Sequence, residues 1–267
     1  ANGGTLPGGA SRLSSGVRVV GADQIQFRND GTIRNTGYLT SGVSLLGRSI
    51  QFLNNGLIEA SAGTYSDDRG VSRPATGTAA ATIDDPAVLE FRNTGTIRST
   101  TAPYAAESQF TLLGRGTANI VNSGTLASSG LIFTGGAQNA TDDLSVTVSN
   151  SGEVSNTELF IDAGNRFSDT NGTLRPLYRN VDLSFENTGR FTTAALTVAG
   201  KAENVRIDIV NRGRFAGPAA SFFGLGRTRV NDPIEWIAVN GAAPIAGTAS
   251  VRVANYADMS IANGDVN

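Results

Sequence analysis

The sequence predicts an all-β protein, a right-handed parallel β-helix of about eight coils with three loop insertions. Two alternating phrases support this prediction. The first, apolar-x-apolar-x-Asn-x-Gly-x-apolar, appears at residues 25–33 and returns around Asn54, Asn93, Asn122, Asn150, Asn187, Asn211 and Asn255. The second, apolar-x-apolar-x-Gly, appears at residues 17–21, 43–47, 110–114, 131–135, 196–200 and 220–224. Such self-similarity is typical of solenoid proteins.

Each phrase is expected to form one short strand, because its apolar residues alternate with others as on a sheet with one buried face. The residue that ends each phrase suits a turn with a positive φ angle. Successive asparagines of the first phrase lie 24 to 44 residues apart, and the shortest steps leave room for three strands and three turns. That is one coil. Eight coils stacked at roughly 4.8 Å would form a rod about 40 Å long.

The recurring asparagine predicts a ladder of side chains. An asparagine amide can donate to the carbonyl oxygen of the same residue in the next coil, and an unpaired buried amide costs more than the bond contributes. The predicted column contains Asn29, Asn54, Asn93, Asn122, Asn150, Asn187, Asn211 and Asn255, the last with Ala257 in place of glycine. The alternative is a set of independent hairpin turns, although hairpins favour adjacent Asn-Gly.

Three breaks in the repeat, at residues 63–85, 165–180 and 225–247, are expected to be surface loops. Insertions in solenoids collect on the surface, where recognition residues are often placed. The candidate binding residues are Tyr65, Asp67, Asp68, Arg69, Arg175, Tyr178 and Trp236. The alternative is that these loops are solvated elaborations. Residues 1–16 are expected to be a Gly/Ser-rich lead-in, and residues 17–267 a part of a longer solenoid.

Composition excludes several kinds of chemistry. The 267 residues include no His and no Cys, which removes Ser-His-Asp and Cys-His nucleophile systems, His-based metal sites and structural zinc. A net charge of -2 indicates no preference for nucleic acid. No apolar run is long enough to insert this segment in a membrane as a helix. We assign no catalytic residue, no metal ligand and no cofactor.

Paired carboxylates are the remaining candidates for catalysis. They occur at 67–68, 84–85 and 142–143. Some β-helix enzymes use clustered carboxylates to cut polysaccharides or to hold Ca²⁺. Neighbouring acids point to opposite faces of a strand, so the pairs alone are weak evidence. The Gly-Gly-x-Gly-x-Asp repeat that binds Ca²⁺ between coils is absent.

The repeat units at residues 91–97 and 148–154 resemble those of bacterial autotransporter passenger domains and filamentous-haemagglutinin-type adhesins. The resemblance covers roughly residues 17–267 and concerns the style of the repeat. It implies a right-handed parallel β-helix that is exported and displayed outside the cell. The chain contains no recognisable secretion signal, membrane barrel segment or catalytic motif of that family.

These observations favour an extracellular structural or adhesive rod on a bacterial surface. Its expected partners are a protein or glycan of a host or neighbouring cell, or further copies of itself end to end. The alternative function is a β-helix polysaccharide lyase or hydrolase. An enzyme would need the acidic residues at 67–68 or 84–85 to meet an arginine in one cleft.

Overall fold

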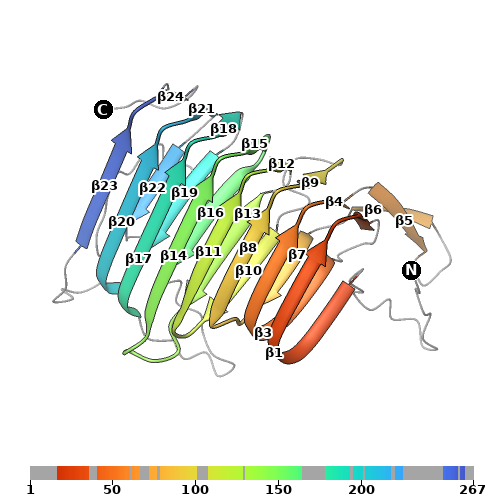
Figure 1. Cartoon of the computed structure of the whole chain (residues 1–267), viewed down its shortest axis with the longest axis horizontal. Coiled ribbons are helices and arrows are strands. Elements are labelled where there is room, and N and C mark those ends of the chain that lie inside the picture. The colour runs from red at the N-terminus through yellow and green to blue at the C-terminus, as the bar shows by residue number, and fades with distance from the viewer. Residues whose placement is uncertain are drawn as a thin grey trace.

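The computed structural model confirms the predicted fold class, a parallel β-helix of eight coils (Figure 1). The chain winds through three sheet faces in each coil, and nearly every strand pairs in parallel with the equivalent strand of the next coil. The residues that the structure describes are 17–35, 41–60, 62–66, 72–76, 79–100, 108–128, 130–163, 178–192, 195–200, 202–217, 220–224, 249–257 and 259–261.

The first and second faces together form the largest sheet. β1 (Val17–Asn29) and β3 (Ser41–Asn54) run through both faces without interruption. The later strands of the first face are β7 (Ala79–Asp84), β10 (Ser108–Leu113), β13 (Leu131–Gly136), β16 (Glu158–Ala163), β19 (Ala195–Gly200) and β22 (Ala220–Gly224). Those of the second face are β8 (Val88–Asn93), β11 (Gly116–Asn122), β14 (Asp143–Asn150), β17 (Tyr178–Asn187), β20 (Ala202–Asn211) and β23 (Ala249–Asn255).

The third face is built from short strands that follow the asparagine corner and lie along the upper edge in Figure 1. It consists of β2 (Thr32–Asn35), β4 (Leu57–Ala60), β9 (Thr96–Ser99), β12 (Thr125–Ala127), β15 (Glu153–Ser155), β18 (Arg190–Thr192), β21 (Arg214–Gly217) and β24 (Met259–Ile261). Because each coil returns to the same corner, equivalent residues form straight columns along the rod.

The core fills the space enclosed by the three faces. Every second residue of each strand points inward, so columns such as Ile25, Ile50 and Leu89 are buried in register. Phenylalanines stack along another column, with ring centroids 4.9 Å apart for Phe27–Phe52 and 4.8 Å for Phe52–Phe91. Full burial of such a side chain contributes about 1.5–3 kcal/mol, and an aromatic pair adds about 0.5–1.5 kcal/mol.

The first predicted loop is partly wrong. Residues 79–84 form the solenoid strand β7, and the insertion before it contains an antiparallel hairpin of β5 (Ala62–Ser66) and β6 (Ser72–Thr76). The phrase was missed because Asp85, with φ 56°, takes the place that Gly47 holds one coil earlier. Aspartate is one of the few non-glycine residues that tolerate this left-handed conformation.

The positive φ expected at the end of each phrase is confirmed at Gly21 and Gly114, which end copies of the second phrase. The expectation is wrong for the glycines of the Asn-x-Gly corners, none of which has a positive φ among the described residues. The corner glycines are instead needed for close approach between coils. A Cβ on Gly124 would lie 2.0 Å from the Gly95 carbonyl oxygen, and the same contact, at 2.0–2.1 Å, would arise at Gly56, Gly95, Gly152, Gly189 and Gly213.

Candidate lateral binding groove

The predicted asparagine ladder is present in full. Each Nδ2 donates to the Oδ1 of the next coil over 2.7–2.8 Å, from Asn29 at one end to Asn255 at the other. All of these asparagines except Asn255 are buried. The backbone strengthens the same corner, because the Asn93 carbonyl accepts from both Ser123 N–H (2.8 Å) and Gly124 N–H (3.0 Å). The ladder therefore fixes which coil lies on which.

The prediction that Tyr178 is a binding residue in a surface loop is wrong. It is the first residue of β17 and is fully buried, and its hydroxyl donates to the Gly114 carbonyl over 3.1 Å. Burial, and then the negative charge of Asp142, raise its pKa. Tyr65 lies in β5, while Asp67, Asp68, Arg69, Arg175 and Trp236 lie outside the described residues, as does the lead-in at 1–16.

The carboxylates at 142–143 have separate roles. Asp142 is buried, and its Oδ2 accepts from the backbone N–H groups of Gln138 (2.9 Å) and Asn139 (2.8 Å), which closes the turn before β14. Asp143 points outward and forms a two-bond ion pair with Arg179. Hydrogen bonding from Arg179 is the main cause that holds the pKa of Asp143 below its usual value. Both carboxylates therefore accept hydrogen bonds from other groups of the protein.

The pair at 84–85 lies elsewhere, at the end of β7 on the first face. Burial, and then the charge of Asp85, raise the pKa of Asp84, while a hydrogen bond from Thr111 opposes the shift. Within the described part of the chain, no arginine forms an ion pair with Asp84 or Asp85. The arrangement expected of a sugar-cleaving site is therefore not found at this pair.

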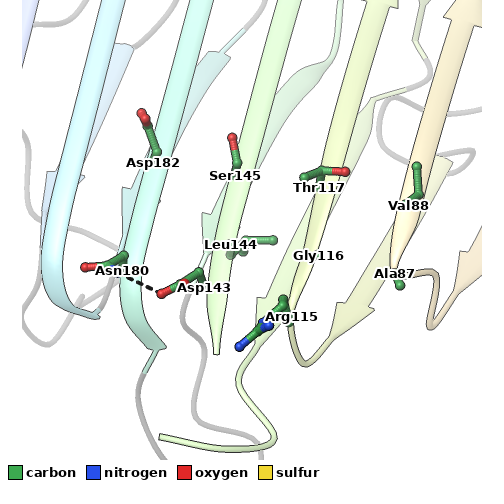
Figure 2. A pocket seen from close by; sticks show the side chains of 10 residues that line it. All are labelled: Ala87, Val88, Arg115, Gly116, Thr117, Asp143, Leu144, Ser145, Asn180 and Asp182. Atoms are coloured by element: carbon green, nitrogen blue, oxygen red, sulfur yellow. Dashed lines mark hydrogen bonds between the residues drawn. The ribbon is translucent and has the colours of Figure 1, made fainter. Parts of the chain in front are cut away.

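A groove of about 550 Å³ lies on the outer surface of the second face, where β8, β11, β14 and β17 begin (Figure 2). Two rows of side chains line it. The upper row in Figure 2 holds Val88, Thr117, Ser145 and Asp182, and the lower row holds Ala87, Arg115, Asp143 and Asn180. The groove thus runs along the rod, across four successive coils.

A second, exterior ladder begins in the lower row at Asp143 and Asn180 and continues to Asn204, one coil beyond the groove. Asn180 Nδ2 donates to Asp143 Oδ1 over 2.8 Å, and Asn204 Nδ2 donates to Asn180 Oδ1 over 2.9 Å. Arg115 lies close enough to contribute to the lowered pKa of Asp143. In the upper row, Asp182 faces Arg206 at 3.9 Å. The groove therefore presents amide, carboxylate, hydroxyl and guanidinium groups in fixed positions on a continuous sheet.

Sequence reasoning did not select this groove, because it looked for function in the insertions. A signal was nevertheless available. Asp143, Asn180 and Asn204 each lie seven residues before a ladder asparagine, namely Asn150, Asn187 and Asn211. Residues at equal offsets from the ladder must align in the stacked coils, so the exterior row follows from the sequence once the coil register is known.

Two kinds of feature are absent from the described residues. They hold no group of three or more acidic, His or Cys side chains arranged to bind a metal ion. They also include no helix of the length and apolarity needed to cross a membrane. Comparisons of the chain with protein-family models, curated proteins and solved structures found no match.

Proposed function

We propose that this chain is a structural and adhesive rod on the outside of a bacterial cell, and that the lateral groove contacts a glycan or protein of a host or neighbouring cell. The observation that carries the proposal is the exterior row Asp143–Asn180–Asn204, whose polar side chains hold one another in register. Polar groups that are already fixed lose less entropy when a ligand binds than mobile ones do.

The chemistry of the groove fits hydroxyl-rich ligands best. The Asn180 amide offers both a donor and an acceptor, the Asp143 carboxylate accepts, and the Arg115 guanidinium donates. Val88 adds an apolar surface, with 42% of its area exposed. A glycan presents alternating hydroxyls and apolar C–H faces, so we favour a glycan over a protein as the partner of this groove.

The exported location rests on the style of the repeat and on composition. The corner phrase Asn-x-Gly-x-apolar resembles the repeats of bacterial surface proteins, and the absence of Cys suits export without disulfide chemistry. A rod held by eight stacked asparagine corners would also serve as a stiff spacer, because each coil pairs directly with the next.

Catalysis on polysaccharide is less well supported. Glycoside hydrolysis needs one carboxylic acid with a raised pKa to protonate the leaving oxygen. In the groove, the pKa of Asp143 is lowered by Arg179, whereas the carboxyl with a raised pKa, Asp84, lies on another face. We therefore propose a groove that binds its ligand without transforming it.

A glycan array probed with the labelled chain tests the binding proposal. Asn180→Ala should weaken the strongest signals about tenfold, which corresponds to about 1.4 kcal/mol, a single lost hydrogen bond in the groove. The matched control is Asn119→Ala, because Asn119 lies on the same face and bonds Glu90, yet does not line the groove. Equal binding by both variants, or no bound glycan at all, would contradict the proposed role of the groove.

Turnover assays address the alternative function. Incubation with neutral and acidic polysaccharides should release no new reducing or unsaturated ends. Cleavage that disappears in Asp143→Asn, Asp182→Asn or Asp84→Asn would overturn the proposal in favour of an enzyme.

A further inference from the structure

The lateral groove carries its charged groups at separate places along the rod. Arg115 lies just before β11, while Asp143 and Asp182 belong to β14 and β17, one and two coils further on. Figure 2 shows Arg115 beside Asp143 in the lower row and Asp182 in the upper row. Which of these charges is already balanced by the protein decides which kind of glycan the groove favours.

The Asp143 carboxylate is largely satisfied by the protein itself. Its Oδ1 accepts from Arg179 Nε at 3.0 Å and from Asn180 Nδ2 at 2.8 Å, and its Oδ2 accepts from Arg179 Nη2. Arg179 balances the charge of Asp143 without lining the groove. Because three N–H donors already surround this carboxylate, it repels an approaching anion weakly and keeps limited acceptor capacity for hydroxyl groups.

Arg115 has no such partner. Among the described residues, no carboxylate lies within ion-pair distance of its guanidinium, and no hydrogen bond holds it. Of the causes that lower the pKa of Asp143, the charge of Arg115 is the weakest. The Arg115 side chain is also exposed. The described lining of the groove therefore offers a guanidinium whose charge and donors can meet a ligand.

Asp182 does not cancel the charge of Arg115. The two residues lie two coils apart, which corresponds to roughly 10 Å along the rod. Exposed charges are largely screened from one another beyond about 8 Å at physiological salt. Asp182 also has Arg206 of the following coil at 3.9 Å. Positive charge therefore remains at the Arg115 end of the groove.

An apolar surface lies beside Arg115. Val88 pairs in register with Thr117, two residues after Arg115, and is among the exposed large apolar residues of the protein. Ala87 follows Arg115 in the lower row, on the side away from Asp143 (Figure 2). A small inorganic anion would use the guanidinium and leave this apolar surface uncovered. A sugar that carries a carboxylate brings an anionic group and an apolar C–H face together in one rigid ring.

We propose that the groove selects acidic glycans, with the carboxylate of a sugar acid bound by Arg115 and the C–H face of the same ring against Val88. Arginine presents parallel N–H donors in the geometry that a carboxylate accepts, so it binds a carboxylate more strongly than a hydroxyl. Asn180, one coil beyond Asp143, is placed for the hydroxyls of the adjoining sugar. This inference rests on the proposed glycan-binding function and adds the class of sugar.

A glycan array that presents sialylated and uronate-containing glycans beside their neutral parent glycans tests the preference. The wild-type chain should bind the acidic glycans about tenfold more strongly than their parents, and Arg115→Gln should bind both equally. The matched control is Arg92→Gln, which removes the same charge from an exposed position on the same face outside the groove and should keep the preference. Both variants should keep the wild-type melting temperature, because both side chains are exposed.

Calorimetric titration of the strongest acidic glycan beside its methyl ester isolates the carboxylate. Esterification should weaken wild-type binding about tenfold and leave binding to Arg115→Gln unchanged. Equal binding of acidic and neutral glycans, a preference for sulfated glycans, a preference that survives in Arg115→Gln, or one lost equally in Arg92→Gln would overturn the inference. In each of those cases the glycan-binding groove still stands if Asn180→Ala weakens binding. If no glycan binds, both proposals fail.

Discussion

Substitution of Asn150 by alanine is the sharpest test of the ladder. The side chain accepts from Asn122 Nδ2 at 2.7 Å and donates to Asn187 Oδ1 at 2.8 Å, with 3% of the residue exposed. After its removal, the Asn122 amide would keep only the carbonyls of Gly124 and Glu153, both at 3.4 Å. Two buried polar groups would therefore be left poorly satisfied.

Each poorly satisfied group costs about 1–1.5 kcal/mol, so Asn150→Ala should destabilise the protein by about 2–3 kcal/mol. For a domain of this size that corresponds to a fall in Tm of about 4–12 °C. Urea and thermal unfolding followed by far-UV circular dichroism would measure both quantities.

Two control variants separate the ladder from the general effect of losing an asparagine. Asn139→Ala removes an exposed side chain in the turn before β14 and should change stability by less than about 0.5 kcal/mol. Asn255→Ala removes the exposed end of the ladder and should cost about 1 kcal/mol or less. If all three variants unfolded at the wild-type urea midpoint, the ladder would contribute nothing measurable and the argument would be refuted.

Three further substitutions test other parts of the structure. Gly124→Ala should lower the free energy of unfolding by at least about 2 kcal/mol, because its Cβ would lie 2.0 Å from a backbone oxygen. A urea midpoint equal to that of the wild type would contradict this and show that the coils can move apart. Tyr178→Phe should cost about 1–2 kcal/mol by the same measurement, since the buried Gly114 carbonyl loses its donor. Asp84→Asn should raise Tm at pH 7 but not at about pH 3, below the pKa of about 3.9 of an unfolded aspartate. Because burial raises the pKa of Asp84 in the folded protein, the wild type loses stability as the pH rises from the unfolded pKa through the folded pKa. A pH-independent difference would contradict the last prediction.

The repeat predicted the coil architecture because one physical requirement recurs in every coil. Asn29, Asn54 and their successors must align for the amides to pair, so their spacing reports the stacking directly. The strand at 79–84 was missed because the residue that ends it does not have to be an asparagine or a glycine. Asp85 adopts the left-handed turn there, so no glycine marks the end of the phrase. Tyr178 was misplaced because the partner of its buried hydroxyl, the Gly114 carbonyl, lies 64 residues earlier in sequence.

The lateral groove shows why a solenoid's function is harder to infer than its fold. Inward positions are mostly apolar, and the corner positions are asparagine and glycine in every coil except the last, where Ala257 replaces the glycine, so both leave a periodic signal. Outward positions carry no such requirement, and Asp143, Asn180 and Asn204 share only polarity. Their alignment becomes visible when the seven-residue offset from the ladder is applied to each coil in turn. The ladder therefore defines which outward-facing residues lie next to one another in successive coils. A binding site in such a protein is found by comparing these aligned positions between coils rather than by searching for local motifs along the chain.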